Sequence, residues 1–149
     1  MKSKWDARFL ELAKHVSSWS KDPSTKCGAV IVDTDRRVIS LGFNGFPINT
    51  SDATELYVDR EEKYRRVIHA EQNAMAFSYR DIRGCSIYVW PMPPCSQCSA
   101  MIIQRGIRRV ITVRPTDEQV NRWGDGFLSS ESMLRDAGVC VEFMEIQND

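Results

Sequence analysis

The second half of the chain alternates short apolar segments with helical ones, and this alternation limits the folds available to it. Residues 85–90 (CSIYVW), 108–113 (RRVITV) and 139–146 (VCVEFMEI) have the β-branched and aromatic content of strands. Helices are predicted between them at residues 95–106 and 128–138, each closed by a glycine. Because strands that alternate with helices pair in parallel through right-handed crossovers, we expect parallel pairing here.

The first half predicts a helix, a hairpin and a second helix. Large apolar residues recur three or four positions apart, as in an amphipathic helix, at Trp5, Phe9, Leu12, Val16 and Trp19. Residues 28–33 and 38–43 are the predicted strands of the hairpin. Residues 67–79 are predicted as a helix, 44–63 as a loop with a polar, helical end, and 117–127 as irregular. The order predicts an α/β fold, a three-layer α/β/α sandwich around a five-stranded mixed sheet.

Composition restricts the class of protein and its partners. A length of 149 residues with 42% hydrophobic and 27% charged residues predicts a single soluble domain over residues 1–149. The formal net charge is +0, so no strong field attracts a polyanion. The arginines occur as scattered pairs, which are typical of solvated surfaces. DNA or RNA polymers are therefore disfavoured as partners, although a few cations can still hold one phosphate.

The sequence predicts a cytoplasmic protein with no membrane partner. Its first twenty residues lack the uninterrupted apolar core of a signal peptide. No apolar run elsewhere approaches the roughly 18 residues that a membrane span requires. The five cysteines, an odd number, fit a reducing compartment better than a disulfide framework.

The motif PPCSQC places Cys95 and Cys98 three residues apart at the start of a predicted helix. Residues i and i+3 share a helix face, so both sulfurs reach one point, and the helix N-terminus favours their thiolate forms. Two thiolates aimed at one point make a soft site for zinc. The motif alone leaves open a redox pair, half of a structural zinc finger, or coincidence.

His69 and Glu71 stand in an otherwise apolar segment, VIHAEQNAMAF. For HAE alone, a satisfied core histidine beside a surface glutamate is the simpler interpretation, whereas the combination with PCSQC favours a metal site. Residues two apart on a helix point about 200° away from each other. We therefore expect His69 at the very start of its helix, turned towards the cysteines. His15, the second of the two histidines, falls on the polar side of the first helix.

The predicted ligand set is one imidazole and two thiolates. The other thiols, Cys27, Cys85 and Cys140, lie in or beside apolar strands, as small hydrophobes do. Three protein ligands with an open fourth position are the arrangement of a catalytic zinc. We therefore expect one catalytic Zn²⁺ per chain.

Glu71 is the predicted proton carrier. A zinc site of this kind lowers the pKa of a bound water from about 15.7 to about 7, which supplies a nucleophile at neutral pH. The leaving group on the attacked carbon must then be protonated. Glu71 lies beside the metal without binding it, and low-dielectric surroundings make it a better proton carrier than a solvated glutamate.

HAEQNA together with PCSQC resembles the H-x-E…P-C-x-x-C signature of the zinc-dependent cytosine deaminase superfamily. SKDPSTKCGAVIVD, GFNGFP and CSQCSAMIIQRGIRRVI look like segments of deoxycytidylate (dCMP) deaminases, so the resemblance covers most of residues 17–113. It implies a cytidine-deaminase-like fold, zinc on His69, Cys95 and Cys98, and a proton shuttle at Glu71. It also implies that Asn44 binds the sugar and that the Ala70 backbone holds the pyrimidine ring.

The resemblance implies hydrolysis of dCMP to dUMP and ammonia, feeding thymidylate synthesis. Many members of the family are oligomers, often hexamers, activated by dCTP and inhibited by dTTP. A homo-oligomer and a dCTP or dTTP effector are therefore expected here. The loop-like, charged residues 44–66 are where we expect the effector.

Two segments depart from the family pattern. YVWPMPPC is one residue longer than the usual YVTLxPC, so Trp90 is a candidate for lining the pocket and equally for the core. The Tyr-His-Asp segment that helps relatives bind the substrate phosphate is replaced by RPTDEQVNRWGDGF. Lys26 and Arg114 are the substitute candidates for the phosphate, and each is equally a candidate for an exposed surface charge.

The sequence is compatible with three other functions. One rival is a deaminase of another cytosine nucleoside or nucleotide, such as cytidine, which a cation at the sugar end of the pocket would distinguish. Another is a deaminase of adenosine in tRNA, which the neutral charge disfavours. The third is a zinc-stabilised binding module without catalysis, which has no use for Glu71.

Overall fold

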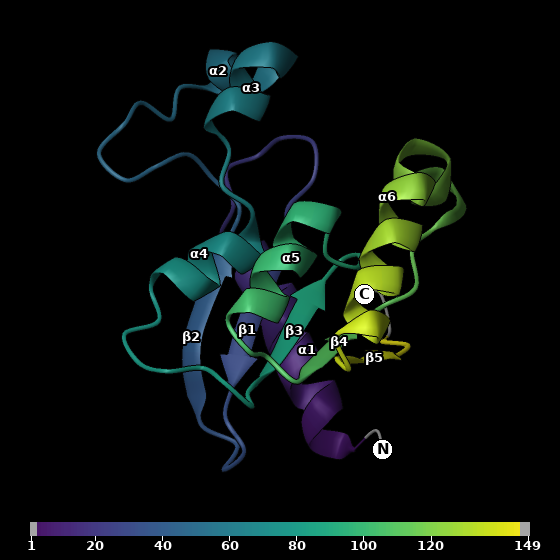
Figure 1. The fold of residues 1–149 in the computed structure, drawn as a ribbon. Helices are drawn as coiled ribbons and strands as arrows, with labels where there is room; N and C mark the ends of the chain where they lie inside the picture. Colours follow the sequence, from purple (N-terminus) through teal and green to yellow (C-terminus); the bar gives the residue numbers. More distant parts are fainter. Residues whose placement is uncertain (1–2, 147–149) are drawn as a thin grey trace.

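A computed structural model describes residues 3–146, and Figure 1 shows its helices and strands. The helices are α1 (Lys4–Ser17), α2 (Thr54–Val58), α3 (Arg60–Arg66), α4 (Ala70–Ala76), α5 (Ser96–Gln104) and α6 (Asp117–Asp136). The strands are β1 (Gly28–Val32), β2 (Val38–Phe43), β3 (Ser86–Trp90), β4 (Arg109–Thr112) and β5 (Cys140–Phe143). None of the helices in this part of the chain combines the length and apolarity needed to cross a bilayer.

The five strands form one mixed sheet in the order β2-β1-β3-β4-β5. Strand β1 is antiparallel to both β2 and β3, whereas β3, β4 and β5 are parallel. Helices α5 and α6 connect the parallel strands, as the alternating pattern predicts. The five-stranded mixed α/β sheet is thus confirmed.

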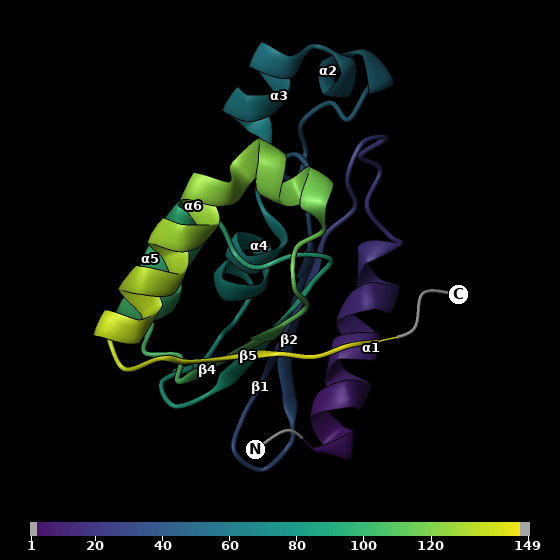
Figure 2. The same ribbon diagram turned by 90° about the vertical axis from the view of Figure 1, so that its right-hand side faces the viewer.

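Helices cover both faces of the sheet, so the predicted three layers are present (Figure 2). Helix α1 lies on one face, where Phe9 and Leu10 pack with Tyr88 and Ile111. The opposite face carries α4, α5 and α6, whose apolar side chains pack on alternate residues of the same strands. Residues 87 and 88 of β3 therefore belong to different cores, as the two-residue period of a strand requires.

Strand register brings distant segments to one edge of the sheet. Gly28 of β1 is opposite Phe43 of β2 and opposite Trp90 of β3. Cys27 and Asn44, which flank these positions, therefore lie at the edge where β3 ends. The parallel strands also end there, and crevices outside such carboxyl ends are the usual ligand sites of α/β sheets.

Helix α4 lies directly on the backbone of β2. A β-carbon added at Gly42 would stand 2.5 Å from the Ala74 nitrogen and 2.6 Å from the Ala70 oxygen. Only glycine permits this approach, which sets the depth of the α4 N-terminus relative to the sheet. Gly28 plays the same part for α1, since a β-carbon there would meet the Ala13 oxygen at 2.1 Å.

The segment 117–127, predicted as irregular, is helical, and α6 runs from Asp117 to Asp136. Thr116 caps it by accepting a hydrogen bond from the Gln119 amide, and the Gln119 side chain accepts from the Thr116 amide. Gly124 and Gly126 lie within the helix, where each glycine costs only about 1 kcal/mol relative to alanine. Figure 2 shows α6 bent, with its first turns at an angle to the rest.

Two other boundaries differ from prediction. Helix α4 begins at Ala70 and not at residue 67, because Ile68 is held in an extended bridge with Gly45, and it ends at Ala76. Helix α1 ends at Ser17, so Trp19 lies beyond the helix and is 48% exposed. Its ring meets Phe43 of β2 edge-on instead of joining the core.

Residues 45–66, here named the α2–α3 lobe, stand at one end of the molecule (Figure 1). The Phe46 and Tyr57 rings stack at 4.0 Å within the lobe. Lys63 anchors it to the loop before β1 through an ion pair with Asp22, at 2.8 Å. The lobe is the predicted loop with a helical end, although its helical content is larger than predicted.

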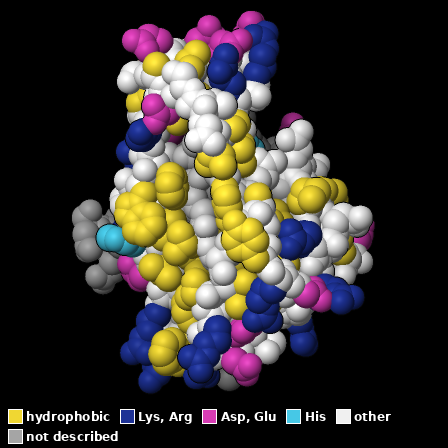
Figure 3. All heavy atoms as spheres, turned by 90° about the vertical axis from the view of Figure 1, so that its left-hand side faces the viewer, with side chains coloured by type: hydrophobic (Ala, Val, Ile, Leu, Met, Phe, Trp, Pro, Cys, Tyr) yellow, Lys and Arg dark blue, Asp and Glu magenta, His cyan; other side chains and the backbone are white. Residues whose placement is uncertain are grey.

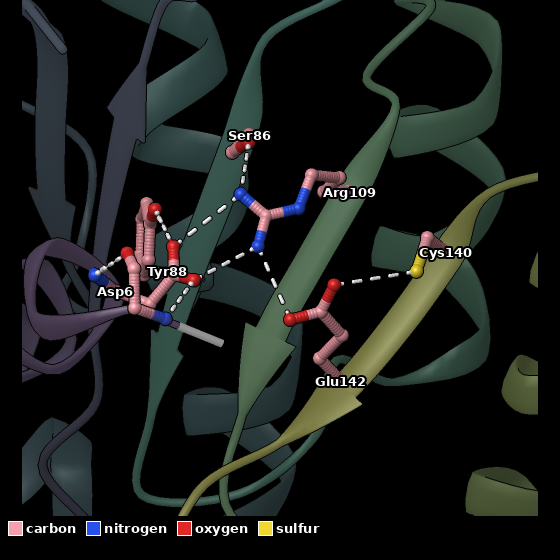
Figure 4. A network of polar contacts seen from close by, with 7 residues as sticks. Asp6, Ser86, Tyr88, Arg109, Cys140 and Glu142 are labelled. Carbon is pink, nitrogen blue, oxygen red and sulfur yellow. Dashed lines mark hydrogen bonds and ion pairs between the residues drawn. The ribbon is translucent and has the colours of Figure 1, made fainter. Parts of the chain in front are cut away.

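A polar network fastens α1 to the sheet on the face away from α4 (Figure 4). The buried Asp6 carboxylate accepts from the Tyr88 hydroxyl at 2.6 Å and from Arg109 at 3.0 Å. Arg109 also pairs with Glu142 of β5 at 3.1 Å. Burial alone raises the pKa of Asp6, but these hydrogen bonds outweigh it, so the pKa lies below its ordinary value.

We predict that Gly42→Ala separates α4 from β2 and destabilises the protein by about 2 kcal/mol, the scale of an overpacked core. The displaced α4 N-terminus should also lower activity. Gly126→Ala is the matched control, because a β-carbon at this helical position meets nothing within 4 Å. It should stabilise the protein by up to about 1 kcal/mol. Urea unfolding measures the free energy of unfolding of both variants. A Gly42→Ala protein as stable as the wild type would contradict the close packing of α4 on β2.

We predict that Arg109→Met costs about 3 kcal/mol at pH 7, because it leaves the buried Asp6 carboxylate without its cation. The pKa of Asp6 is depressed in the folded protein, so its contribution is present above the unfolded pKa of about 3.9 and is lost at lower pH. The stability difference should therefore shrink below about pH 4. Urea unfolding at several pH values measures it, with exposed Arg108→Met as control; a pH-independent difference would argue against the ion pair.

Candidate metal and catalytic site

His69 is the residue that precedes α4, at its N-cap position. Its backbone is extended, with φ −72° and ψ 157°, because Ile68 forms the bridge to Gly45 on the preceding segment. The Gln72 side chain accepts from the His69 amide at 2.8 Å, which fixes the start of the helix. The predicted place of His69 at the very start of its helix is confirmed.

Cys95 and Cys98 occupy the start of α5. Cys95 is the N-cap, after Pro93 and Pro94, and its sulfur accepts from the Cys98 amide at 3.4 Å. Cys98 is in the first turn and fully buried. The two sulfurs thus share one helix end, as the spacing predicts.

The three predicted ligand atoms converge on one point. Nδ1 of His69 is 3.3 Å from Sγ of Cys98 and 3.4 Å from Sγ of Cys95. A tetrahedral zinc ion about 2.3 Å from sulfur and about 2.1 Å from nitrogen would hold such atoms about 3.6 Å apart. Within residues 3–146, His69, Cys95 and Cys98 form the one group of this kind, and no fourth side chain joins them. The donor set therefore fits a zinc ion with an open position.

The cysteines have opposite proton affinities. The Cys98 thiol and the His69 imidazole hydrogen-bond to Cys95 and lower the pKa of its thiol to about 4. The same contact with the Cys95 thiolate, together with burial, raises the pKa of Cys98. Hydrogen bonding to Cys95 also raises the pKa of His69. These contacts favour the thiolate at Cys95 and the thiol at Cys98, whose proton a divalent cation would displace.

Glu71 lies in the first turn of α4 and is buried beside this group. Burial raises the pKa of its carboxyl above the ordinary value. The His69 imidazole lowers that pKa and the Cys95 thiolate raises it, so the carboxyl is within electrostatic reach of both ligands. A buried carboxyl with a raised pKa beside an open metal position is suited to proton transfer.

These groups lie in a cleft of about 960 Å³. His69, Glu71 and Cys95 line it together with the predicted substrate residues Asn44 and Ala70. The Asn44 carboxamide accepts from the Cys27 amide at 2.8 Å and donates to the Thr25 carbonyl at 2.9 Å. Asn44 therefore also holds the loop before β1 against the end of β2.

The other three substrate candidates are placed differently. Trp90 lines the cleft and also packs against the core beneath α1, so it belongs both to the pocket wall and to the core. Arg114 lines the cleft and stacks over Phe143 at 4.6 Å. Lys26 is exposed and does not line the cleft; its ammonium donates to the Ser20 carbonyl at 2.5 Å. The structure does not bring Lys26 to the site.

Sequence reasoning missed several residues of the cleft wall. Lys63 and Tyr64 of α3 and Arg122 and Trp123 of α6 line it. Arg122 and Trp123 lie in residues 117–127, which the sequence predicts as irregular and which are helical in the structure. Of the remaining thiols, Cys27 lines the cleft and Cys85 is buried. Cys140 is exposed, contrary to the prediction of a small hydrophobe, and donates to Glu142 at 3.5 Å.

A three-ligand metal group beside a buried carboxyl, at the carboxyl edge of an α/β sheet, defines a zinc-dependent hydrolytic enzyme. The family described as the cytidine and deoxycytidylate deaminase zinc-binding region matches residues 3–114. The chain belongs to the cytidine and deoxycytidylate deaminase family.

Three relatives illustrate the likeness. An Aliivibrio fischeri protein described as an uncharacterized deaminase in the luxG 3′ region is 44% identical over 98% of this chain and 97% of its own. Mouse deoxycytidylate deaminase is 40% identical over 72% of this chain and 63% of its own. The crystal structure of dCMP deaminase from cyanophage S-TIM5 with dCMP and dUMP has a TM-score of 0.78 and 30% identity, covering 97% and 99% of the two chains.

We predict that Cys98→Ser lowers the zinc content of the purified protein well below one ion per chain, because it replaces a buried thiolate with a poorer ligand. Cys140→Ser is the matched control, since this thiol is exposed and outside the metal group. Elemental analysis of both proteins, with circular dichroism to verify folding, provides the measurement. Full zinc occupancy in a folded Cys98→Ser protein would remove Cys98 from the ligand set.

Proposed function

We propose that this chain hydrolyses dCMP to dUMP and ammonia. The observation that carries the proposal is the convergence of His69, Cys95 and Cys98 beside the buried Glu71 carboxyl, in a member of the cytidine and deoxycytidylate deaminase family. The cyanophage relative, similar over nearly the whole chain, is described in complex with dCMP and dUMP. The similarity to mouse deoxycytidylate deaminase supports the same substrate for this chain.

In the proposed reaction, water adds to C4 of cytosine, the C4–N bond breaks, and ammonia leaves. Zinc held by His69, Cys95 and Cys98 would make the attacking water more acidic. The Glu71 carboxyl would carry the two protons of the water in turn, one to N3 of the ring and one to the departing amino group, which leaves uracil and ammonia. Its burial suits this cycle, because a raised carboxyl pKa lies closer to that of the groups between which the proton moves.

The substrate contacts are part of the proposal. Asn44 would bind the sugar through its Oδ1 atom, which has a lone pair beyond the one used by the Cys27 amide. The Ala70 backbone, at the start of α4, would hold the pyrimidine, and Trp90 would form part of the wall. Arg114 is a proposed phosphate contact at the cleft. Lys26, which lies outside the lining, has no structural support for that role.

The rival functions are less well supported. A zinc-stabilised module has no use for Glu71, whose charged form is costly to bury. A tRNA substrate needs a basic face, whereas this chain has a formal net charge of +0. Cytidine or another cytosine nucleotide is the closer competitor, and it differs from dCMP only in the sugar and phosphate.

We further propose, on the family resemblance, that residues 1–149 act as one deaminase domain in a homo-oligomer that dCTP or dTTP regulates, with an effector site within residues 44–66. Exposed hydrophobic side chains support self-association. Val38 and Phe43 lie on β2, the edge strand, and Trp19 contacts Phe43. Figure 3, which faces the β2 edge, shows a band of hydrophobic side chains across this surface.

The test is ammonia release from dCMP, cytidine, deoxycytidine and dCTP as substrates, with dCTP or dTTP then added to the dCMP reaction. We expect dCMP to give the highest kcat/KM. Glu71→Gln should lower kcat on dCMP by about 10²- to 10⁴-fold while zinc is retained, because it removes the proton carrier and no ligand.

Glu131→Gln is the control, since Glu131 lines the same cleft but pairs with Arg135 on the surface. A Glu71→Gln enzyme with full activity would refute the mechanism. A higher kcat/KM on cytidine would refute the assigned substrate.

A further inference from the structure

The Asn44 carboxamide is held by three protein groups. Its Nδ2 atom donates to the Thr25 carbonyl at 2.9 Å and to the Asp22 carboxylate at 3.3 Å. Its Oδ1 atom accepts from the Cys27 amide at 2.8 Å. The carbonyl and the carboxylate only accept, and the amide only donates, so the carboxamide cannot turn over without losing all three bonds. Both Nδ2 protons are thus used, and Oδ1 is the atom left to bind a ligand, as an acceptor.

Asp22 supports this arrangement in two ways. It lies in the loop before β1, where it is buried and 1% exposed. Its Oδ2 atom faces Nδ2 of Asn44, and its Oδ1 atom accepts from the Ser24 amide at 2.8 Å. The second bond closes a turn just before Thr25, whose carbonyl is the other acceptor for Asn44. Both oxygens of Asp22 therefore accept, so a side chain with a single acceptor oxygen cannot replace the carboxylate.

Lys63 supplies the counter-charge that the buried Asp22 needs. Its ammonium lies 2.8 Å from Oδ2 and 3.1 Å from Oδ1 of the carboxylate. A buried carboxylate without a cation is costly, so this ion pair stabilises Asp22 in the wall of the cleft. Because Lys63 belongs to α3, the α2–α3 lobe and the residue proposed to bind the sugar meet at one carboxylate.

We propose that Asp22 is a positioning residue for the deamination, which keeps the acceptor oxygen of Asn44 turned towards the sugar. This inference rests on the proposed function, which supplies the substrate. The deoxyribose of dCMP has one free hydroxyl, at the 3′ carbon, and a hydroxyl can donate to Oδ1 of Asn44. Asp22 acts through the carboxamide, and it determines how strongly the enzyme favours a sugar that bears this hydroxyl.

The experiment measures kcat/KM for dCMP and for 2′,3′-dideoxycytidine 5′-monophosphate (ddCMP) in the zinc-loaded wild type and in Asp22→Asn. Asparagine has the shape of aspartate, but its amino group would face either the Ser24 amide or the Asn44 carboxamide, where an acceptor is needed. We expect kcat/KM on dCMP to fall about 10-fold, the value of one hydrogen bond, chiefly through KM. On ddCMP it should stay unchanged, because that nucleotide has no 3′-hydroxyl.

Asp33→Asn is the matched control. Asp33 also accepts from backbone amides, those of Asp35 and Arg37 at 2.9 Å, and pairs with Arg80 at 3.4 Å, but it does not line the cleft. This variant should keep the wild-type ratio between the two nucleotides. An equal loss on both nucleotides in Asp22→Asn would show a merely structural role and overturn the assignment. An unchanged ratio would overturn it as well.

Lys63→Met is the second variant, and it covers the case in which Asp22→Asn does not fold. It leaves both acceptor atoms of Asp22 in the protein but removes the cation that holds them in place. The ratio of dCMP to ddCMP should fall in the same direction, by a smaller factor. A contact between Lys63 and the phosphate would not change this ratio, because both nucleotides carry the phosphate. An unchanged ratio in Lys63→Met would overturn the inference in that case.

A measurement without substrate separates this inference from the proposed function. Exchange of the Asn44 Nδ2 protons with solvent, followed by NMR, should be faster in Asp22→Asn than in the wild type and in Asp33→Asn, because an acceptor is lost. If the wild type releases no ammonia from dCMP, the proposed function fails, while the exchange rates still test whether Asp22 holds Asn44. Equal exchange rates in the folded proteins would overturn the role of Asp22, whichever substrate is turned over.

Discussion

The close contact between α4 and the backbone of β2 is the constraint on which the site depends. With Gly42 beneath it, the first turn of α4 lies deep enough for His69 to reach the sulfurs of α5. The ligands come from two helices that are joined to different strands, so their meeting within 3.4 Å requires both helices to be seated on one sheet. Packing, more than any local motif, therefore determines whether a metal can be held.

The chemical group was predictable because its residues are costly to bury without a purpose. The sequence places a histidine and a glutamate at the start of one apolar helix and two cysteines at the start of another. Few functions other than a shared metal site require all four of these polar residues in buried positions. The position of His69 before its helix was also predictable, since residues two apart on a helix point about 200° away from each other. The parallel half of the sheet followed from alternation alone.

The wall of the cleft was not predictable in the same way. Two glycines in GDG resemble a loop, yet the Thr116 cap and tertiary packing keep the helix continuous. Lys26 was a candidate because it is cationic and close in sequence to the site, but which way its side chain turns depends on the Ser20 carbonyl. Arg122 reaches the cleft wall only because the first turns of α6 are helical, which the sequence did not predict. Such features depend on contacts between distant segments.

The bend in α6 has a consequence for how proteins of this kind diversify. Residues 120–128 in the first turns of the helix line the cleft, while its later turns pack on the sheet through Leu134, which also reaches the cleft wall. The α6 residues that line the cleft thus lie on a different helix from the metal ligands and Glu71, which lie at the starts of α4 and α5. Substitutions in those early turns can change which molecules enter while the metal ligands and the proton carrier keep their places. The substrate selectivity of the enzyme can then change in evolution without a change in its catalytic residues.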